Sequence, residues 1–391
     1  MEENVLYKLW LNILCQHEPG LINKFINKFG SAEEIFNSDE KYKNVLLGMK
    51  LSRRLSARRD LEQAKQLLEY CINNDISIIS MGDENYPQRL AEVDNPPQIL
   101  YVRGEMPDFD NLVSVAQVGS RKCSSHAREF SGDLAYDLAS SGIIVVSGMA
   151  EGIDAAAHNG ALSAGNKTVA VLAGGVDIVY PKINKNLYKK IIENGAVISE
   201  RAPGEIGKPR YYQQRNRIIA GLSNGVVIVE GEASSGTKLT ANWALKLNKD
   251  VFAVPGRPDD KGAELPNLLI RDGAKIITNA EDIIEEYISV YPTELKNGVD
   301  LKQKTENKRR STVKPEKAKR ERPNFEKYEE THRIILEYLY NNSEVVHIDD
   351  IVRNCDLNTS EVSFAIVELL IEKVICEYPG EYYSLDIKQE V

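Results

Sequence analysis

The sequence predicts an α/β protein built around a doubly wound, mostly parallel sheet. Between about Ile76 and Asp282, short β-branched runs alternate with helical stretches, which is the order of repeated strand–helix–strand units. The runs 169–172 and 226–229 are apolar at every position, as expected for strands that helices cover on both faces. In such sheets, ligands bind beyond the carboxyl ends of the strands. We therefore expect the functional site at that edge.

A helical domain is predicted before the sheet. Apolar residues recur at helical spacing over residues 5–74, and Ser31, with Glu34 three positions later, predicts a capped helix start. We expect residues 1–75 to form a helical domain similar to SAM or helix-hairpin-helix domains. Four arginines spread around one predicted helix, and we interpret them as a solvated surface rather than a phosphate-binding stripe: Arg53, Arg54, Arg58 and Arg59.

The sheet domain is predicted to span residues 76–290. Its strands, in chain order, are expected at 76–80, 112–118, 143–146, 168–172, 196–199, 225–229, 250–254 and 275–277.

The chain after the sheet divides into two parts. Residues 291–323 have little apolar content and many charges, so they cannot offset the entropy cost of folding, and we predict a flexible basic linker. Residues 324–391 show the pattern of a helix, a short strand, two more helices and a two-stranded hairpin. That order is typical of a winged-helix domain.

The charge is unevenly distributed along the chain. The net charge of −9 weakly disfavours nucleic acid as a partner, because phosphate neutralisation favours Lys and Arg. Residues 111–290, however, carry 20 basic and 20 acidic side chains, and residues 295–323 carry 11 and 4. Residues 326–391 carry 5 and 15. The central domain therefore accommodates a local basic groove, whereas the acidic C-terminal domain is a poor candidate for contacting phosphates.

Length and composition favour a cytoplasmic protein of two or three domains. The chain has 391 residues, of which 42% are hydrophobic, enough for a sizeable core. Its N-terminus lacks a signal-peptide pattern, and no stretch approaches the roughly 18 apolar residues of a membrane span. We therefore expect no membrane contact. The five cysteines are widely scattered without Cys-x-x-Cys spacing, so we expect free, mostly structural thiols.

Two predicted strands end in turns of small residues. One turn is Gly119-Ser120-Arg121, and the other contains Gly148. Backbone amides at such turns, where a helix begins, bind anions, and the Arg121 guanidinium is able to fork onto a phosphate. Tight packing explains a single turn of this kind equally well. Similar turns follow other strands, at Gly174-Gly175, Ser235-Gly236 and Pro255-Gly256.

The segment 208–217 has the composition of a site for single-stranded nucleic acid. Basic groups follow the phosphates while aromatic rings stack on unpaired bases, which contributes about 1–3 kcal/mol per base. The alternative is ordinary loop packing, with Arg215 or Arg217 paired to Glu200 or Glu230, and Arg217 is the stronger structural candidate. The residues concerned are Lys208, Arg210, Tyr211, Tyr212, Arg215, Asn216 and Arg217.

No catalytic residue, metal or cofactor is predicted. His158 lies one helical turn beyond Asp154, but no second His or Cys completes a ligand set, and helix capping accounts for Asp154. Neither a P-loop nor a nucleophile elbow is present in the sequence. We expect a binding protein rather than an enzyme.

The region from about residue 80 to residue 280 resembles the DNA processing protein A family (DprA, also called Smf). Its motifs carry the resemblance: Asn85-Tyr86-Pro87, Asp94-Asn95-Pro96-Pro97, Val118-Gly119-Ser120-Arg121, Ser147-Gly148-Met149-Ala150, Gly152-Ile153-Asp154, Tyr180-Pro181, Ser199-Glu200, Arg215-Asn216-Arg217, Ser235-Gly236-Thr237 and Val254-Pro255-Gly256.

This resemblance implies an extended Rossmann-like fold that binds and protects single-stranded DNA and loads the recombinase RecA onto it in natural transformation. It implies that Arg121 holds a phosphate, that Lys182 adds charge, and that Tyr212 contacts a base. It places Lys208 and Arg210 beside that contact. It also implies a homodimer formed through the Rossmann-like domain.

The chain departs from the family pattern at three places. Ser125-His126-Ala127 stands where a Tyr-Gly pair is common, Gln213 replaces a frequent proline, and Gly262 lies farther from Asn267 than usual. Neither the first nor the third difference removes a proposed DNA contact.

Two other functions fit parts of the sequence less well. A Rossmann-like nucleotide phosphoribohydrolase of the lonely-guy type needs a catalytic glutamate, and Thr240 stands in its position. A duplex-DNA reader would use the predicted helix 360–368, which has no Lys or Arg and two glutamates, so groove insertion meets like-charge repulsion. We predict that this helix contacts protein or self-associates.

Overall fold

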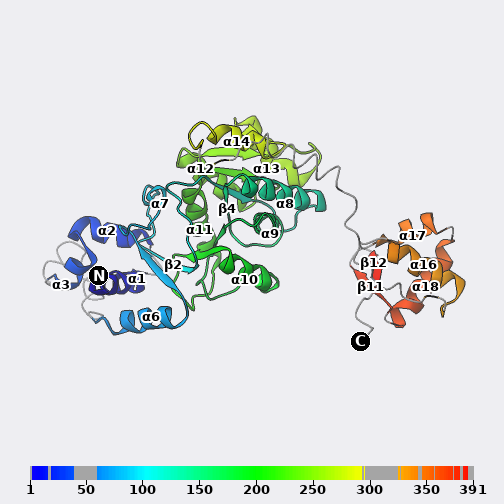
Figure 1. Ribbon diagram of the computed structural model, residues 1–391, viewed down its shortest axis with the longest axis horizontal. Coiled ribbons are helices and arrows are strands. Elements are labelled where there is room, and N and C mark those ends of the chain that lie inside the picture. Colours follow the sequence, from blue (N-terminus) through cyan, green and yellow to red (C-terminus); the bar gives the residue numbers. More distant parts are fainter. Residues whose placement is uncertain are drawn as a thin grey trace. The chain divides into compact units, whose positions relative to one another are not determined.

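The computed structural model divides into two compact units, residues 1–308 and residues 309–391 (Figure 1). It describes residues 2–15, 19–38, 60–292, 295, 325, 327–341, 346–355, 357–372, 374–378 and 382–385. The predicted linker 291–323 lies almost wholly outside these residues, as do Arg53, Arg54, Arg58 and Arg59. The predicted four-part division of the chain stays a prediction.

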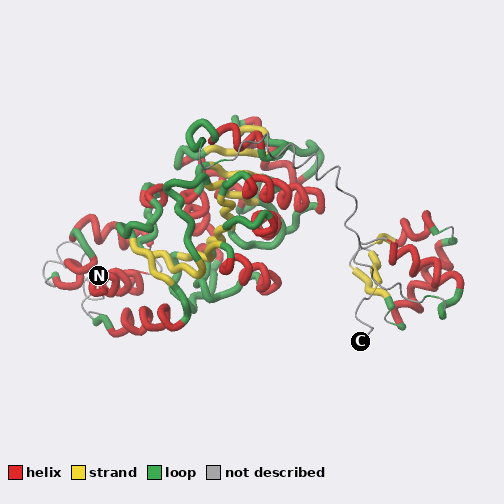
Figure 2. Tube along the Cα trace, viewed as in Figure 1, coloured by secondary structure: helices red, strands yellow, loops and turns green. Residues whose placement is uncertain are grey.

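A nine-stranded sheet forms the centre of the first unit, in the order β1-β2-β6-β5-β4-β3-β7-β8-β9 (Figure 2). The strands from β6 to β9 in this order run parallel, and β2 is antiparallel to both β1 and β6. The mostly parallel sheet is therefore confirmed. The strands are β1 (Ser77–Ser80), β2 (Ile99–Gly104), β3 (Ser114–Val118), β4 (Ile144–Ser147), β5 (Thr168–Val171), β6 (Gly195–Ser199), β7 (Gly225–Ile228), β8 (Asp250–Ala253) and β9 (Lys275–Ile276).

The strand β2 was not predicted. Its sequence, Ile99-Leu100-Tyr101-Val102, is a short apolar run directly after Pro96-Pro97, and all four side chains are buried. Hydrogen bonding to β6 on one side and β1 on the other makes it an interior strand of the sheet. The apolar run was therefore a usable strand signal.

Helices cover both faces of the sheet, as the continuous apolar strands predict. On one face, α8 (Ser125–Ser140), α9 (Ile153–Ser163) and α14 (Glu281–Tyr287) share a core with the strands. On the other face, a second core contains residues of α7 (Gln88–Ala91), α11 (Pro209–Leu222), α12 (Thr237–Lys246) and α13 (Glu264–Arg271).

The N-terminal helices share a third core with the sheet. These are α1 (Glu2–Cys15), α2 (Pro19–Phe29), α3 (Ala32–Asn37) and α6 (Glu62–Asn73). Their buried residues cluster with residues of β2, β5 and α10 (Lys185–Glu193). The Ser31 side chain accepts a hydrogen bond from the Glu34 amide, so the predicted cap is confirmed. Packing therefore continues from these helices into the sheet.

The connection from β6 to β7 determines where the start of α11 lies. The chain leaves β6, passes along α11 and enters β7, which lies on the far side of β3. On this path α11 packs against β3, β4 and β5. The start of α11 consequently lies at the carboxyl ends of these parallel strands, where binding sites form in doubly wound folds.

The C-terminal unit follows the predicted element order. It contains α16 (Glu330–Asn341), β10 (Val346–His347), α17 (Ile348–Asn354), α18 (Thr359–Ile371), β11 (Ile375–Tyr378) and β12 (Tyr382–Leu385). The strands form a small sheet in the order β10-β12-β11. A capping box between Asn358 and Glu361 begins α18. Phe364, Val367 and Ile371 lie exposed on that helix.

No helix among the described residues is long and apolar enough to cross a membrane. The five cysteines, all of them within the described ranges, are free thiols, and Cys15, Cys71 and Cys355 are buried.

His158 is fully buried in α9. Its Nδ1 lies 2.8 Å from Oγ1 of Thr168, whose hydroxyl donates to the Val145 carbonyl. The hydroxyl proton is thus used, so His158 donates from Nδ1, and the buried Nε2 has no hydrogen-bond partner in the described part of the chain. Burial lowers the pKa of His158 to about 3, and the charge of Arg215 lowers it in the same direction. The residue therefore serves the core as a neutral ring.

Acid should destabilise the protein through His158. The unfolded chain binds this proton below about pH 6.5, whereas the folded ring resists it, so the free energy of unfolding falls by up to about 1.4 kcal/mol per pH unit in that window. We expect His158→Asn, which stays neutral, to lack this component. In urea unfolding at several pH values, the stability difference between wild type and variant should narrow from pH 7.5 to pH 5. A stability difference that stays constant over this pH range would contradict the role assigned to His158.

Candidate nucleic-acid interface

The turn after β3 is closed by Glu230. The Ser120 amide donates to the Glu230 carbonyl, and the Ser124 amide and hydroxyl donate to the Glu230 carboxylate. A Cβ on Gly119 would lie 2.6 Å from Ile153 and 2.9 Å from the Glu230 carbonyl oxygen, so close packing accounts for this glycine. The Arg121 side chain is exposed beyond the turn.

The turn after β4 is closed in the same way by Asp154. Its carboxylate accepts hydrogen bonds from the amides of Gly148, at 3.1 Å, and Ala150, at 3.4 Å. Gly152 is the N-cap residue of α9, so the prediction that Asp154 caps the helix was wrong. The predicted phosphate contact of Gly148 stays a prediction, and its amide donates to Asp154 in this structure.

Carboxylates of the protein itself accept hydrogen bonds beside both glycine turns. Asp154 holds two amides of the turn after β4, whereas Glu230 holds Ser124 at the start of α8, just beyond the turn after β3. A phosphate offers the same oxygen acceptors and negative charge as these carboxylates. An anion at the turn after β4 would therefore have to displace Asp154 from the two amides.

Arg215 lies beneath the interface. It is 6% exposed, and its Nη1 donates to the carbonyls of Gly148, at 2.9 Å, and Val171. Burial lowers the pKa of this guanidinium, opposed by the carboxylate of Asp154. A Cβ on Gly148 would lie 2.1 Å from Nη1, so glycine leaves the room that Arg215 occupies. The predicted DNA contact by Arg215 is contradicted by its burial, and the side chain holds strand ends together.

Arg217 is the ion-pair residue that the sequence indicated. Its guanidinium pairs with Glu200, and both side chains are buried. Glu200 also lies 3.5 Å from Arg201, and Arg201 stacks over the ring of Tyr211 with Cζ 4.0 Å from the ring centre. This network connects β6 to the start of α11.

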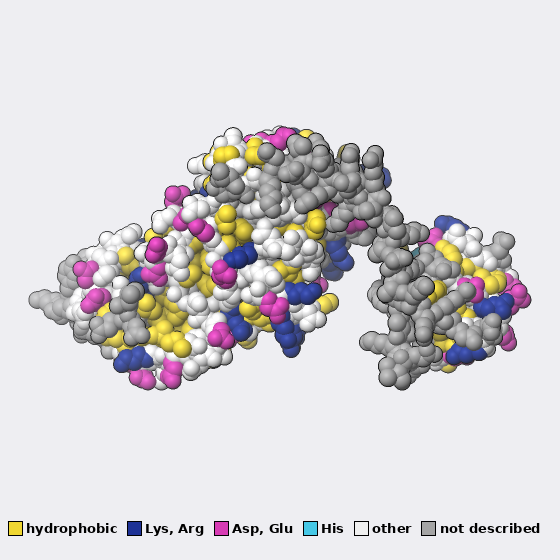
Figure 3. All heavy atoms as spheres, in the orientation of Figure 1, with side chains coloured by type: hydrophobic (Ala, Val, Ile, Leu, Met, Phe, Trp, Pro, Cys, Tyr) yellow, Lys and Arg dark blue, Asp and Glu magenta, His cyan; other side chains and the backbone are white. Residues whose placement is uncertain are grey.

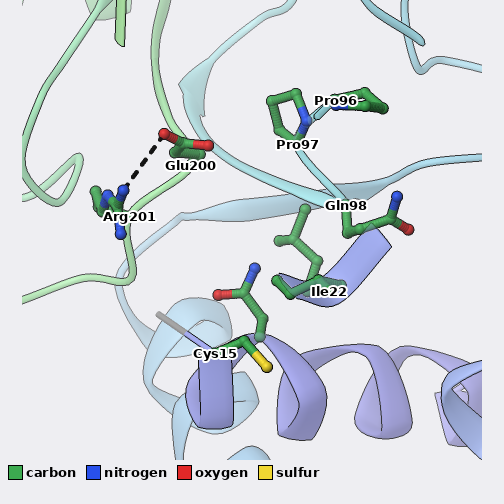
Figure 4. Close-up of a pocket in the computed structure, with 9 residues that line it drawn as sticks. Cys15, Ile22, Pro96, Pro97, Gln98, Glu200 and Arg201 are labelled. Atoms are coloured by element: carbon green, nitrogen blue, oxygen red, sulfur yellow. Dashed lines mark ion pairs between the residues drawn. The ribbon is translucent and has the colours of Figure 1, made fainter. Parts of the chain in front are cut away.

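A small cavity lies beside Glu200 and Arg201 (Figure 4). Glu200 and Arg201 face Cys15 and Ile22 of the N-terminal helices across it, with Pro97 along one side. The Glu200 carboxylate is already bound by two guanidinium groups. The cavity thus marks where the N-terminal helices meet the sheet.

Three exposed or partly exposed groups meet at the carboxyl ends of the strands. Arg121 Cζ lies 5.5 Å from the centre of the Tyr212 ring, and the Tyr180 ring packs edge-on against Tyr212 at 6.3 Å. Burial raises the pKa of Tyr212, with Tyr180 acting in the same direction. A Cβ on Gly207 would lie 3.2 Å from the Tyr212 hydroxyl, so Gly207 permits this ring position. The structure thus brings Arg121 and Tyr212 together, as the DNA-binding prediction requires.

The other predicted cations lie close in sequence to Tyr180 or Tyr212 and are exposed. Lys182 is exposed two residues after Tyr180. Lys208 and Arg210 are exposed and lie 5.7 Å and 5.1 Å from the centre of the buried Tyr211 ring. Figure 3 shows Lys and Arg side chains, in dark blue, around α10, whose exposed face carries Lys185, Lys189 and Lys190. A basic surface thus extends from the aromatic pair along α10.

The last three predicted residues lie on α11 and in the loop before α12. Asn216 accepts a hydrogen bond from Arg215 Nε at 3.2 Å and donates to the Gly236 carbonyl at 3.4 Å. Gly236 is exposed, and a Cβ added there would meet no described atom within 4 Å. The Ser235 hydroxyl has no hydrogen-bond partner among the described residues. Asn216 therefore joins α11 to the loop before α12, and Gly236 leaves that loop open.

Sequence reasoning missed two features of this site. It used Tyr180 only as a motif residue, although an aromatic directly before Pro181-Lys182 repeats the mixture of ring and cation seen at 208–217. It also did not identify Glu230 and Asp154 as the groups that fill the turns. Within the described ranges, no three His, Cys, Asp or Glu side chains gather as metal ligands.

The central region matches a known family. The model of the DNA recombination-mediator protein A family matches residues 53–288. The DNA processing protein DprA of Streptococcus pneumoniae is 39% identical over 208 residues, which is 53% of this chain and 73% of that protein. DprA of Bacillus subtilis is 36% identical over 211 residues, covering 54% and 71% of the two chains. Protein Smf of Escherichia coli is 35% identical over 209 residues, covering 53% and 56%.

Two solved structures are similar as well. The X-ray structure of S. pneumoniae DNA processing protein A has a TM-score of 0.62 at 31% identity, covering 72% of this chain and 96% of that one. The Helicobacter pylori protein, whose structure concerns its binding of single-stranded DNA, has a TM-score of 0.51 at 28% identity, covering 55% and 97%.

Arg215 and Arg121 should differ sharply in their effects on stability. Arg215→Met removes a buried donor from the Gly148 and Val171 carbonyls and the nearby positive charge from Asp154. We expect the free energy of unfolding to fall by about 2–4 kcal/mol. The matched control, Arg121→Met, changes an exposed arginine and should stay within about 0.5 kcal/mol of wild type. Urea unfolding at pH 7 measures both, and equal losses would contradict the assigned positions.

Proposed function

The chain belongs to the DNA recombination-mediator protein A family, and on that premise we propose that it binds single-stranded DNA at the carboxyl ends of β3, β5 and β6. The cluster of Arg121, Tyr212 and Tyr180 carries this proposal. Proteins bind an unpaired strand with cations that contact its phosphates and aromatic rings that stack on its bases. Duplex DNA keeps its bases stacked inside the helix, so it offers these rings no partner.

The filled glycine turns support a polynucleotide over a small nucleotide. Asp154 occupies the Gly148 and Ala150 amides, which are the kind of donors that a bound mononucleotide would use. A polynucleotide phosphate instead meets Arg121 and Lys182 on the outer surface, with further charge from Lys208 and Arg210.

We further propose that the chain acts without catalytic turnover. Thr240, which stands where lonely-guy phosphoribohydrolases carry a glutamate, is 2% exposed and has no carboxylate to offer. Release of free base from nucleoside monophosphates would contradict this proposal.

The wider role follows the family. The proposed task is to protect incoming single strands in the cytoplasm and to load RecA onto them during transformation, as a homodimer formed through the sheet domain. We propose that residues 1–75 are a SAM-like or helix-hairpin-helix-like domain and that residues 324–391 are a winged helix. The exposed apolar side chains and glutamates of α18 suit contact with protein better than contact with DNA.

A salt titration tests the DNA-binding proposal. Wild type should bind single-stranded oligonucleotides more tightly than duplexes of the same length. Arg121→Ala should weaken single-strand binding and reduce the slope of log affinity against log salt by about 0.7, because one phosphate contact is lost. Tyr212→Ala should weaken binding with less change in slope. Fluorescence anisotropy at four or more salt concentrations gives both quantities.

Two controls sharpen this test. Arg257→Ala removes an exposed arginine that pairs with Asp259 and should leave affinity and slope unchanged. Equal binding of single strands and duplexes would contradict the proposal. Unchanged binding by both Arg121→Ala and Tyr212→Ala would contradict it as well.

The C-terminal unit should contribute little to strand affinity. Residues 326–391 carry 5 basic and 15 acidic side chains, so they repel phosphates. Deleting residues 324–391 should leave single-strand affinity within about twofold of wild type under the same conditions. A large loss of affinity on deletion would show that this unit contacts DNA.

A further inference from the structure

Two aromatic rings, Tyr180 and Tyr212, lie beside Arg121, and the proposed function does not say which of them stacks on a base. Tyr180 is 56% exposed, whereas Tyr212 belongs to the partly buried residues. More than half of the Tyr180 surface is therefore open to a ligand. The two rings therefore differ in what each is free to contact.

Tyr212 is enclosed by its neighbours. Arg121 and Arg215 lie 5.5 Å and 5.9 Å from its ring centre, and Tyr180 packs edge-on against it. Its hydroxyl end lies against Gly207. A base stacking on Tyr212 would have to move at least one of these groups.

Tyr180 offers the more open ring. Its contact with Tyr212 is an edge-to-face one, with 65° between the ring planes, so this contact does not stack the two rings face to face. The next residues continue the same kind of surface, since Lys182 is exposed and Ile183 is 78% exposed. Within four residues the chain thus presents a ring, a cation and an apolar side chain.

The charges around Tyr180 fit a strand that passes over it. Arg121 lies on one side of the ring pair, at Tyr212. After Tyr180 the chain continues through Lys182 into α10, where Lys185 and Lys189 are exposed and four residues apart, on one face of the helix. Arg121 is thus close to the aromatic pair in space, and Lys182 is close to it in sequence.

We propose that Tyr180 is the ring on which a base of the bound strand stacks, and that Tyr212 is the support that holds Tyr180 and Arg121 in position. This inference rests on the proposed function and assigns separate roles to the two rings. The backbone phosphates on either side of the stacked base then meet Arg121 and Lys182.

An abasic oligonucleotide separates stacking from charge. Full-length wild type and Tyr180→Ala are titrated with an oligo-dT and with an abasic strand of the same length and phosphate number. On oligo-dT, Tyr180→Ala should bind roughly 5- to 150-fold more weakly, which corresponds to the stacking of one base. On the abasic strand the two proteins should bind equally. The slope against salt should match wild type on both strands.

Matched variants control for the fold and the ring. Tyr180→Phe keeps the ring and should restore most of the affinity for oligo-dT. Tyr382→Ala removes another exposed tyrosine, from the C-terminal unit, and should bind as wild type does. A further variant, Tyr180→Trp, should lose indole fluorescence on addition of oligo-dT beyond any change at Trp10 and Trp243 of the wild type.

Three results would overturn the inference. They are no loss of affinity in Tyr180→Ala, an equal loss on the oligo-dT and abasic strands, and no fluorescence change in a Tyr180→Trp chain that binds oligo-dT. Failure of the proposed function looks different, because the wild type itself would then bind neither strand.

Discussion

Asp154 reaches back from the first turn of α9 to the amides of Gly148 and Ala150, and the interface is built on this closure. The carboxylate fixes the turn, and the turn presents the Gly148 carbonyl to Arg215 from the other side. Glu230 closes the neighbouring turn through the Ser124 amide and hydroxyl. Because Asp154 holds the Gly148 and Ala150 amides, a ligand at the end of β4 would meet side chains rather than these backbone amides.

The crossover helix α11 places those side chains. Its buried residues Arg215 and Arg217 fasten it to β4 and β5 and to the end of β6, through two carbonyls and the Glu200 carboxylate. Buried arginines are costly to desolvate, and here the Gly148 and Val171 carbonyls and the Glu200 carboxylate offset that cost. Because the helix is fixed, Tyr212 in its first turn meets Arg121 and Tyr180, which come from two other strand ends. One helix thus carries both the buried arginines and Tyr212, the ring that Arg121 and Tyr180 contact.

The charge is distributed differently in the two parts of the chain. The strand ends and α10 expose lysines and arginines, whereas the C-terminal unit is acidic and exposes Phe364, Val367 and Ile371 on α18. Carboxylates beside apolar side chains repel phosphates while leaving apolar area to bury. A protein partner for the C-terminal unit and a DNA partner for the sheet are therefore compatible within one chain of net charge −9.

The sequence by itself determined the layered α/β class, most strands, the cap at Ser31, the element order of residues 330–385 and the family. These depend on local patterns, since apolar periodicity, turn residues and short motifs are readable within a few neighbouring positions. It also indicated the structural role of Arg217, whose buried guanidinium pairs with Glu200. It did not identify β2, the burial of Arg215 or the filled turn at Gly148. Glu230 and Ser124 are 106 residues apart, and Arg215 and Gly148 are 67 apart. Whether an amide faces solvent or a carboxylate, and whether an arginine faces a phosphate or the core, is decided only when distant strand ends assemble side by side.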